Sequence, residues 1–233
     1  MNLLAIDAAG SVLSVAVARG EDILYAETEA GMKHSELVMD CIDDQMKKAG
    51  LVPGNLDGIL CMGGPGSFTG LRIGYSIAKG LALALGIPFA PVPTLDCIAL
   101  EHNAPQNYPS LVLPVIEARK NAYFFTIFRN GERLIPDTDA AACQIAETLR
   151  LNYSTGKIFL TGPAAALLYD SFSEELKSRL NIAHKTRGYA RELITIAKNR
   201  NMLHNDNTAY LYSGPEYIRK TDAELNLSGK NGS

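Results

Sequence analysis

Residues 3–7, LLAID, form a short apolar run that ends at an acid, and residues 111–117, LVLPVIE, form a second run with the same ending. A run of this length and composition is typical of a buried β-strand. A shift of the chain by 110 residues pairs the sequence AIDA at 5–8 with VIEA at 115–118. We therefore predict that one α/β unit occurs twice in this chain.

The elements around these two runs follow the same order. Each run leads into further β-prone segments joined by tight turns, which predicts an antiparallel meander. The segments are residues 14–17 and 23–25 in the first half and residues 122–128 and 134–135 in the second half. Later in each half a strand passes through a Gly-Pro pair into a helix, at Gly64-Pro65 and at Gly162-Pro163.

The fold expected from this repeat is α/β, with two related subdomains that each hold a mixed sheet and flanking helices. We expect residues 1–104 to form the N-terminal subdomain, with a glycine-rich loop and partner-binding helices. Residues 105–233 form the C-terminal subdomain, and residues 103–109 between them have the composition of a linker.

Composition excludes several classes of protein. Of the 233 residues, 47% are hydrophobic and 20% charged, which is typical of a globular fold and not of a disordered chain. A net charge of −3 does not fit a strongly basic nucleic-acid-binding protein. The apolar runs are too short for a transmembrane helix, and the first residues lack the basic start of a signal peptide. Four scattered cysteines predict reduced thiols, so we expect a cytoplasmic protein without membrane contact.

The loop at residues 63–70 is the sharpest local feature of the sequence. It follows a predicted strand at 58–62 and precedes a predicted helix at 70–85. Backbone N–H groups in such a loop can hold a phosphate. The candidate residues are Gly63, Gly64, Gly66, Ser67 and Thr69. The spacing fits neither the Walker A nor the dinucleotide pattern, so a tight turn that lets the helix pack closely on the sheet is the alternative.

Catalytic residues are hard to assemble from this sequence. Asp7 and Glu117 end equivalent strands and could face one cleft, as metal–nucleotide chemistry would require; an ion pair between Glu117 and a neighbour such as Arg119 is the alternative. The four histidines are too far apart for a metal motif, and no Gly-x-Ser-x-Gly elbow occurs. We expect neither a catalytic residue nor a metal ligand in this chain.

Two amphipathic helices, expected at residues 35–49 and 70–85, carry more apolar area than one small sheet face can cover. An uncovered apolar patch marks an interface, and small residues let two helices approach closely. The predicted interface residues are Val38, Cys41, Ile42, Met46, Gly70, Gly74, Ile77, Ala78 and Leu81. Two copies of the chain could also associate through this patch as a homodimer when no other partner is present.

A basic run extends from Lys177 to Arg200 and contains seven cations but one acid, Glu192. Arg187 and Arg191 are the candidate phosphate contacts within it. A solvated helix face is the alternative interpretation.

The sequence GGPGSFTGLRIG at residues 63–74 closely resembles the TsaB (YeaZ) family, whose members are needed to make threonylcarbamoyl-adenosine in tRNA. Shorter segments agree with it: HSE at 34–36, AKGLA at 78–82, EAR at 117–119 where the family has Asp-Ala-Arg, and PEYIR at 215–219. The resemblance covers nearly the whole chain. It implies a duplicated actin/Hsp70-like (ASKHA) fold, in agreement with the internal repeat.

The resemblance also implies a function. The chain would be a non-catalytic scaffold subunit that works with a TsaD-like paralogue and a TsaE-like ATPase. The reaction is threonylcarbamoylation of adenosine 37 in tRNAs that read codons beginning with A. ATP and metal would reside on the partner subunits, so no cofactor is expected here, and tRNA would be bound only through the complex. The paralogue would contact the two apolar helices.

Ala8 and Ala9 stand where the family has Thr-Ser, which counts against nucleotide binding. The alternative function is an enzyme that acts alone, either a degenerate ASKHA ATPase or a glycoprotease-like peptidase. ATP turnover by the isolated chain would distinguish the two functions.

Overall fold

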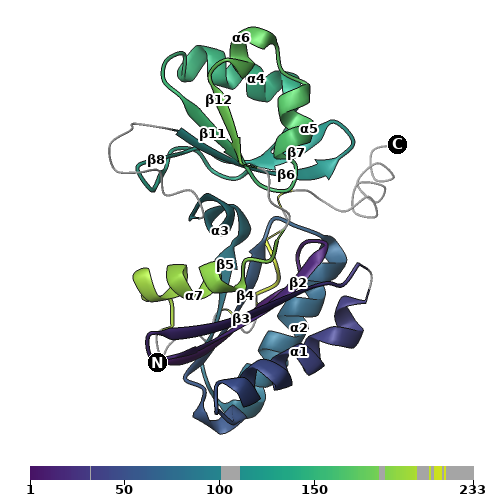
Figure 1. The fold of residues 1–233 in the computed structure, drawn as a ribbon, viewed down its shortest axis with the longest axis vertical. Helices are drawn as coiled ribbons and strands as arrows, with labels where there is room; N and C mark the ends of the chain where they lie inside the picture. Colours follow the sequence, from purple (N-terminus) through teal and green to yellow (C-terminus); the bar gives the residue numbers. More distant parts are fainter. Residues whose placement is uncertain are drawn as a thin grey trace, which may run out of the picture.

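Two lobes, each built around one β-sheet, lie one above the other in the computed structural model (Figure 1). The structure describes residues 1–31, 33–100, 111–183, 187–203, 210, 213–216 and 218. The predicted subdomain boundary between residues 104 and 105 and the predicted linker at 103–109 lie outside these residues.

The first sheet has the strand order β3-β2-β1-β4-β5. An antiparallel meander of β1 to β3 continues into β4 and β5, which run parallel to β1. This confirms the predicted meander in the first half. The bounds of the five strands are Asn2–Asp7, Val12–Arg19, Asp22–Glu29, Gly58–Gly64 and Phe89–Pro93.

The second sheet repeats this topology with the order β10-β7-β6-β11-β12, and the short strands β8 and β9 extend it beside β6. The strand bounds, from β6 to β12, are Leu111–Arg119, Ala122–Phe125, Phe128–Arg129, Glu132–Arg133, Thr138–Ala141, Ile158–Thr161 and Leu180–Ala183. Gly64 ends β4 with a φ of 111°, and Gly162 follows the equivalent strand β11 with a φ of 106°. The predicted duplication and the α/β fold of two related sheets are therefore confirmed.

Helices cover both faces of the first sheet (Figure 1). On one face α1 (His34–Lys48) and α2 (Phe68–Leu85) pack side by side, as predicted within two residues. Ser67 caps the start of α2 by accepting a hydrogen bond from Gly70 N, and Gly86 ends the helix with φ of 65°. On the other face lie α3 (Thr94–Leu100) and α7 (Ala190–Asn199).

Alternate residues along β1 point to the two faces of the first sheet and so create two cores. Leu3 and Ala5 pack with α7, whereas Leu4 and Ile6 pack with α1 and α2. This period of two is the pattern expected for a strand that is buried on both sides. Among the described residues, no helix is long and apolar enough to cross a membrane.

In the second lobe, three helices cover one face of the sheet: α4 (Ala142–Asn152), α5 (Ala165–Asp170) and α6 (Glu174–Lys177). The short 3-10 helix η1 (Pro53–Asn55) precedes β4 in the first lobe. On the opposite face of the second sheet, Ala99 of α3 packs against Val112 and Phe128. Helix α3 therefore joins the two lobes.

An ion-pair cluster also crosses between the lobes. Asp96 on α3 pairs with Arg133 of β9 and with Arg200 at the end of α7, and Arg133 pairs in turn with Asp137. The Asp96 side chain is only 3% exposed. Each guanidinium compensates the cost of burying this carboxylate, so the cluster favours one arrangement of the lobes.

Three differences from the predicted elements have physical causes. Residues 122–128 do not form one strand, because the chain bends after Phe125 and the Thr126 hydroxyl donates to the carbonyl of Ile135. The strand predicted at residues 134–135 is wrong; β9 ends at Arg133. Helix α7 was expected in the C-terminal subdomain, but its apolar side contacts β1, β2 and β4 of the first sheet.

Candidate functional site

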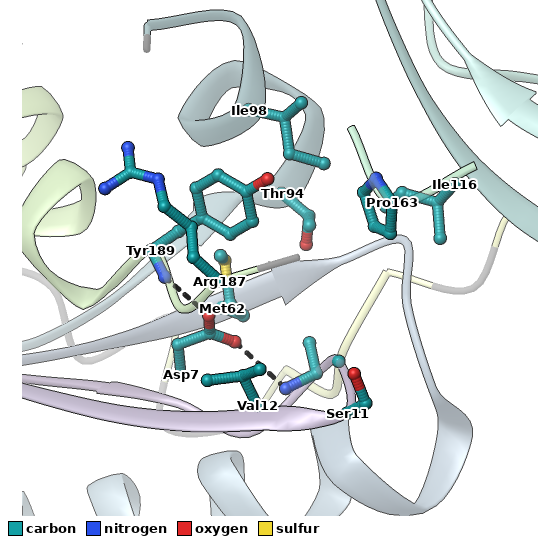
Figure 2. A pocket seen from close by; sticks show the side chains of 12 residues that line it. Asp7, Ser11, Val12, Met62, Thr94, Ile98, Ile116, Pro163, Arg187 and Tyr189 are labelled. Carbon is teal, nitrogen blue, oxygen red and sulfur yellow. Dashed lines mark hydrogen bonds between the residues drawn. The ribbon is translucent and has the colours of Figure 1, made fainter. Parts of the chain in front are cut away.

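A small pocket lies between the lobes at the end of β1 (Figure 2). Asp7 and Tyr189 line it from the first lobe, and Ile116 and Pro163 line it from the second. Its volume is about 60 Å³, enough for a few water molecules. This volume is well below the roughly 300–1,000 Å³ that is usual for small-molecule sites.

Asp7 is the acid of this pocket and is only 2% exposed. Its Oδ1 accepts a hydrogen bond from Ala9 N at 3.0 Å and its Oδ2 accepts one from Tyr189 N at 2.8 Å (Figure 2). Burial raises the pKa of Asp7 to about 6, and the two backbone hydrogen bonds oppose that rise. Because both oxygens accept backbone hydrogen bonds, the carboxylate holds the chain together at this point.

The start of α7 is attached to the first sheet through three successive N–H groups. Gly188 N donates to Glu27 on β3, Tyr189 N to Asp7 on β1, and Ala190 N to Ser14 on β2. Side chains of the sheet therefore supply the acceptors that the first turn of a helix lacks. A Cβ on Gly188 would lie 2.2 Å from the Cβ of Ser14, so this approach requires glycine. Sequence reasoning missed the contact because its partners are more than 160 residues apart.

Glu117 does not join Asp7, so the predicted pair of acids is wrong. Glu117 is exposed on β6, and its neighbour Ile116 faces the pocket instead. The β6–β7 hairpin shifts register between Glu117 and Arg119 and continues to a two-residue turn. The first hairpin already ends its pairing at Asp7 and Ser14. The two acids therefore occupy different environments although their strands are equivalent.

The glycine-rich loop packs tightly against the turn that follows β1. A Cβ on Gly70 would lie 1.9 Å from the carbonyl oxygen of Ala8, and one on Gly66 would lie 3.0 Å from the Cβ of Ala9. Ser67 N donates to the carbonyl of Ala9 at 2.9 Å. Gly63 and Gly64 lie at the end of β4, and Gly63 O accepts a hydrogen bond from Glu216 N. These contacts favour the tight-turn interpretation of the loop, with Thr69 exposed on the first turn of α2.

Most of the predicted interface residues belong to the core of the first lobe. Val38, Ile42, Met46 and Ala78 are at most 6% exposed and pack with β1, β2 and β4. Gly70 and Gly74 are also buried. Ala78 of α2 and the three α1 side chains therefore face the chain's own sheet, and the prediction that these side chains form an uncovered patch is wrong. The sheet is wide enough to cover them.

The remaining interface candidates line a narrower surface between α1 and α2. Cys41, Ile77 and Leu81 are partly exposed, as are Leu37 and Ile73 beside them. Ile73, Ile77 and Leu81 follow one another at intervals of four residues, which places them in one row along α2. We call these five residues the α1–α2 ridge. The ridge leaves an apolar strip at the surface.

The basic run does not form one surface. Lys177 pairs with Glu174, and Arg179 donates to backbone carbonyls of the second lobe. On the first lobe Lys198 donates to Gly20 O at 2.5 Å, and Arg200 pairs with Asp96. These cations lie on separate elements of two lobes and serve local contacts.

The two candidate phosphate contacts differ from each other. Arg187 lines the interlobe pocket and pairs at 2.7 Å with Glu192, whose side chain is 10% exposed. Arg191 is exposed and lies over the ring of Tyr25 at 5.5 Å. Arg187 therefore contributes to the buried polar structure around α7, and only Arg191 offers its charge at the surface.

Among the described residues, the cysteines and histidines do not form a further functional site. Cys41, Cys61, Cys97 and Cys143 are all free, as predicted, although Cys143 is exposed. Burial raises the pKa values of the Cys61 and Cys97 thiols well above the usual value. In the part of the chain that the structure describes, no three potential metal ligands come together. His184 and His204 lie outside that part.

Comparison with known proteins identifies the family to which this chain belongs. The family model of tRNA N6-adenosine threonylcarbamoyltransferase, TsaD, matches residues 27–227. Three curated relatives are named tRNA threonylcarbamoyladenosine biosynthesis protein TsaB, among them one from Bacillus subtilis and one from Haemophilus influenzae. The one from Bacillus subtilis is 31% identical over 156 residues, which cover 64% of this chain and 66% of the relative. The chain belongs to this family, on its TsaB (YeaZ) branch.

The relative from Haemophilus influenzae is 31% identical over 129 residues that cover 54% of this chain and 53% of its own length. The matches thus span between about half and two thirds of these relatives. The solved structure of YeaZ from Pseudomonas aeruginosa aligns with a TM-score of 0.72 at 22% identity, over 93% of this chain and 99% of that one. This likeness shows that the two-lobed fold is that of YeaZ.

Proposed function

We propose that this TsaB-branch chain is a non-catalytic scaffold subunit in the threonylcarbamoylation of adenosine in tRNA. The observation that carries the proposal is the state of Asp7. Among the described residues it is the only acid that lines the interlobe pocket, and its two oxygens already accept backbone hydrogen bonds. A carboxylate held in this way stabilises the fold and is poorly placed to bind a metal–nucleotide or to move a proton. The names of the curated relatives supply the pathway.

The partner in this proposal is a TsaD-like paralogue that binds the α1–α2 ridge. Leu37, Cys41, Ile73, Ile77 and Leu81 present apolar atoms beside each other on two packed helices. A paralogue built on the same fold can offer an equivalent pair of helices. A row of residues four apart on each helix then packs into the grooves of the other. Without the paralogue, two copies of this chain would pair through the same ridge.

A TsaE-like ATPase is the third component of the proposed complex, and ATP and metal belong to the partner subunits. The chain would act in the cytoplasm on tRNAs that read codons beginning with A, at adenosine 37. In the proposal, tRNA reaches this chain only after the paralogue has bound.

Co-purification with the paralogue, followed by a modification assay on unmodified tRNA, tests the proposal. We expect the wild-type chain to bind the paralogue and to be required for modification. Ile73→Asp with Ile77→Asp should weaken binding by at least about 30-fold, because an apolar interface core carries 2 kcal/mol or more per hot-spot residue.

Leu83→Asp is the matched control for this experiment. Leu83 is 64% exposed on α2 and lies six residues after Ile77, roughly 120° away around the helix. The control should bind like the wild type. Equal binding by the double variant and the wild type would contradict the assigned surface. Sustained ATP hydrolysis by the isolated chain, lost in Asp7→Ala, would contradict the non-catalytic role.

A further inference from the structure

A second, more open hollow lies on the C-terminal lobe, away from the interlobe pocket. It has a volume of about 250 Å³ and is bounded by the β6–β7 turn, β10 and the start of α4. Polar and charged side chains line most of it: Arg119, Lys120, Asn121, Asp139 and Gln144. We call it the hairpin cleft. Neither the interlobe pocket nor the α1–α2 ridge includes any of these residues.

Two cations at the cleft, Arg119 and Lys120, lack the local partners that several other basic residues of this chain have. Arg119 and Lys120 are exposed, and neither forms an ion pair or a side-chain hydrogen bond with a described residue. By contrast, Arg133, Lys198 and Arg200 are all committed to acids or carbonyls. The charges of Arg119 and Lys120 are therefore available to an external anion.

The geometry of the turn holds both cations at one edge of the cleft. Asn121 adopts a φ of 62°, which lets the chain reverse its direction within two residues. The side chains of Arg119 and Lys120 therefore both lie at the rim of the cleft. Across the cleft the first turn of α4 contains no acid, and Ala141 N is already satisfied by Gln144 Oε1 at 2.9 Å. Asp139 is the one acid among the described lining residues, so the cations outnumber it.

We propose that the hairpin cleft binds the phosphodiester backbone of RNA, through Arg119 and Lys120. This assignment rests on the proposed function in tRNA modification. Arginine, lysine, asparagine and exposed N–H groups are the donors that proteins direct at phosphate oxygens. An acidic protein surface fits less well, because the apolar part of the described lining is alanine alone, whereas protein interfaces depend on aromatic and large apolar anchors.

The anion site can be tested on the isolated chain, independently of any partner. Inorganic phosphate is titrated against amide-resolved NMR spectra, with chloride at equal ionic strength as the reference. We expect phosphate to shift the amides of Lys120, Asn121 and Cys143, and Arg119→Glu with Lys120→Glu to abolish these shifts. Absence of any phosphate-specific shift in the wild type would overturn the proposal.

The RNA assignment is tested with the complex of this chain and its paralogue, by filter binding of a tRNA transcript at several salt concentrations. The double variant should bind more weakly, and the slope of log K against log salt should fall in magnitude by about 1 to 2, because two phosphate contacts are lost. The matched control is Arg129→Glu with Arg150→Glu, which changes the charge equally on the same lobe but outside the cleft.

The outcomes separate this inference from the proposed function. A wild-type complex that forms and binds RNA, with a double variant of unchanged affinity and salt slope, would overturn the RNA assignment and leave the proposed function intact. If the double variant and the control lost the same amount of affinity for tRNA, the loss would be a general effect of charge, and the RNA assignment would also be overturned. Loss of paralogue binding in the double variant would show that the cleft contacts protein. Failure of the wild-type chain to bind the paralogue at all would contradict the proposed function and, with it, the RNA assignment.

Discussion

Asp7, near the end of β1, is 2% exposed and accepts two backbone hydrogen bonds, whereas Glu117 on the equivalent strand β6 is exposed to solvent. The start of α2, which contains Gly70, and the start of α7 both close over the first hairpin. The second hairpin continues past Glu117 to Arg119 and ends beside an open cleft. The turn that follows β1 therefore holds segments of the first lobe together, whereas the equivalent turn of the second lobe is exposed beside a cleft.

The difference follows from the elements that surround each turn. The first turn meets two segments at backbone distance, and each approach depends on a glycine, Gly70 or Gly188. Two oxygen atoms at that turn accept hydrogen bonds from N–H groups of other segments: Asp7 Oδ2 accepts from Tyr189 N, and the carbonyl of Ala9 accepts from Ser67 N. The second turn has a two-residue loop closed by Asn121, so its side chains project outward. Mutations at equivalent positions should therefore differ in their effects on stability.

The largest effect is expected at Gly70. Gly70→Ala should destabilise the chain by about 3 kcal/mol or more, because the new Cβ would lie 1.9 Å from a backbone oxygen that cannot move aside cheaply. Urea unfolding of the isolated chain measures this change. Gly74→Ala is the control on the same helix, since a Cβ there meets no atom of the described residues within 4 Å. It should stabilise the chain by about 0.5–1 kcal/mol through helix propensity. Similar effects of the two substitutions would contradict the close packing of the first turn.

The next effect concerns the two acids. At pH 5, Asp7→Ala should cost about 2–4 kcal/mol, because it leaves the N–H groups of Ala9 and Tyr189 buried without acceptors. Glu117→Ala should change the free energy of unfolding by less than about 0.5 kcal/mol, as is usual for an exposed side chain. Chemical denaturation at one pH compares the pair. A large loss of unfolding free energy in Glu117→Ala would mean that the second turn also stabilises the fold.

Asp7 should also make stability depend on pH. Its pKa rises from 3.8 in the unfolded chain to about 6 in the folded one, so the folded state holds the proton more tightly. The resulting stabilisation is fully present below pH 3.8 and is lost as pH rises through about 6. At 1.36 kcal/mol per pKa unit, up to about 3 kcal/mol is involved. The cost of Asp7→Ala should therefore shrink between pH 4 and pH 8. If the cost of Asp7→Ala instead grew over this range, folding would lower the pKa of Asp7 and not raise it.

The smallest effect is expected at the tip of the second hairpin. Asn121→Ala should cost about 1 kcal/mol, because a φ of 62° strains alanine more than asparagine. Asn121→Gly should be neutral or slightly stabilising, since glycine adopts this conformation without strain. Thermal melting of both variants measures the difference. If alanine were tolerated as well as glycine, the turn would not have the conformation described.

The sequence was sufficient for the elements with strong local patterns. Helices α1 and α2, the first meander and the duplication follow from periodicity, glycine stops and the 110-residue repeat. The burial of Val38 and Ala78 could not be predicted, because an amphipathic face is equally apolar against the chain's own sheet or against a partner. The anchoring of α7 by Asp7, Glu27 and Ser14 depends on contacts between distant segments that leave no local signal.

The central claim is that this chain acts by binding partners and not by chemistry at Asp7. The most direct test is tRNA threonylcarbamoylation by the reconstituted complex at pH 7.5, with the paralogue saturated by wild-type chain or by Asp7→Asn. Circular dichroism and a binding assay first establish that the variant is folded and bound. We predict that the saturated Asp7→Asn complex modifies tRNA as the wild type does. A loss of about 100-fold or more in a folded, bound variant, the size expected for a catalytic acid or base, would contradict the account.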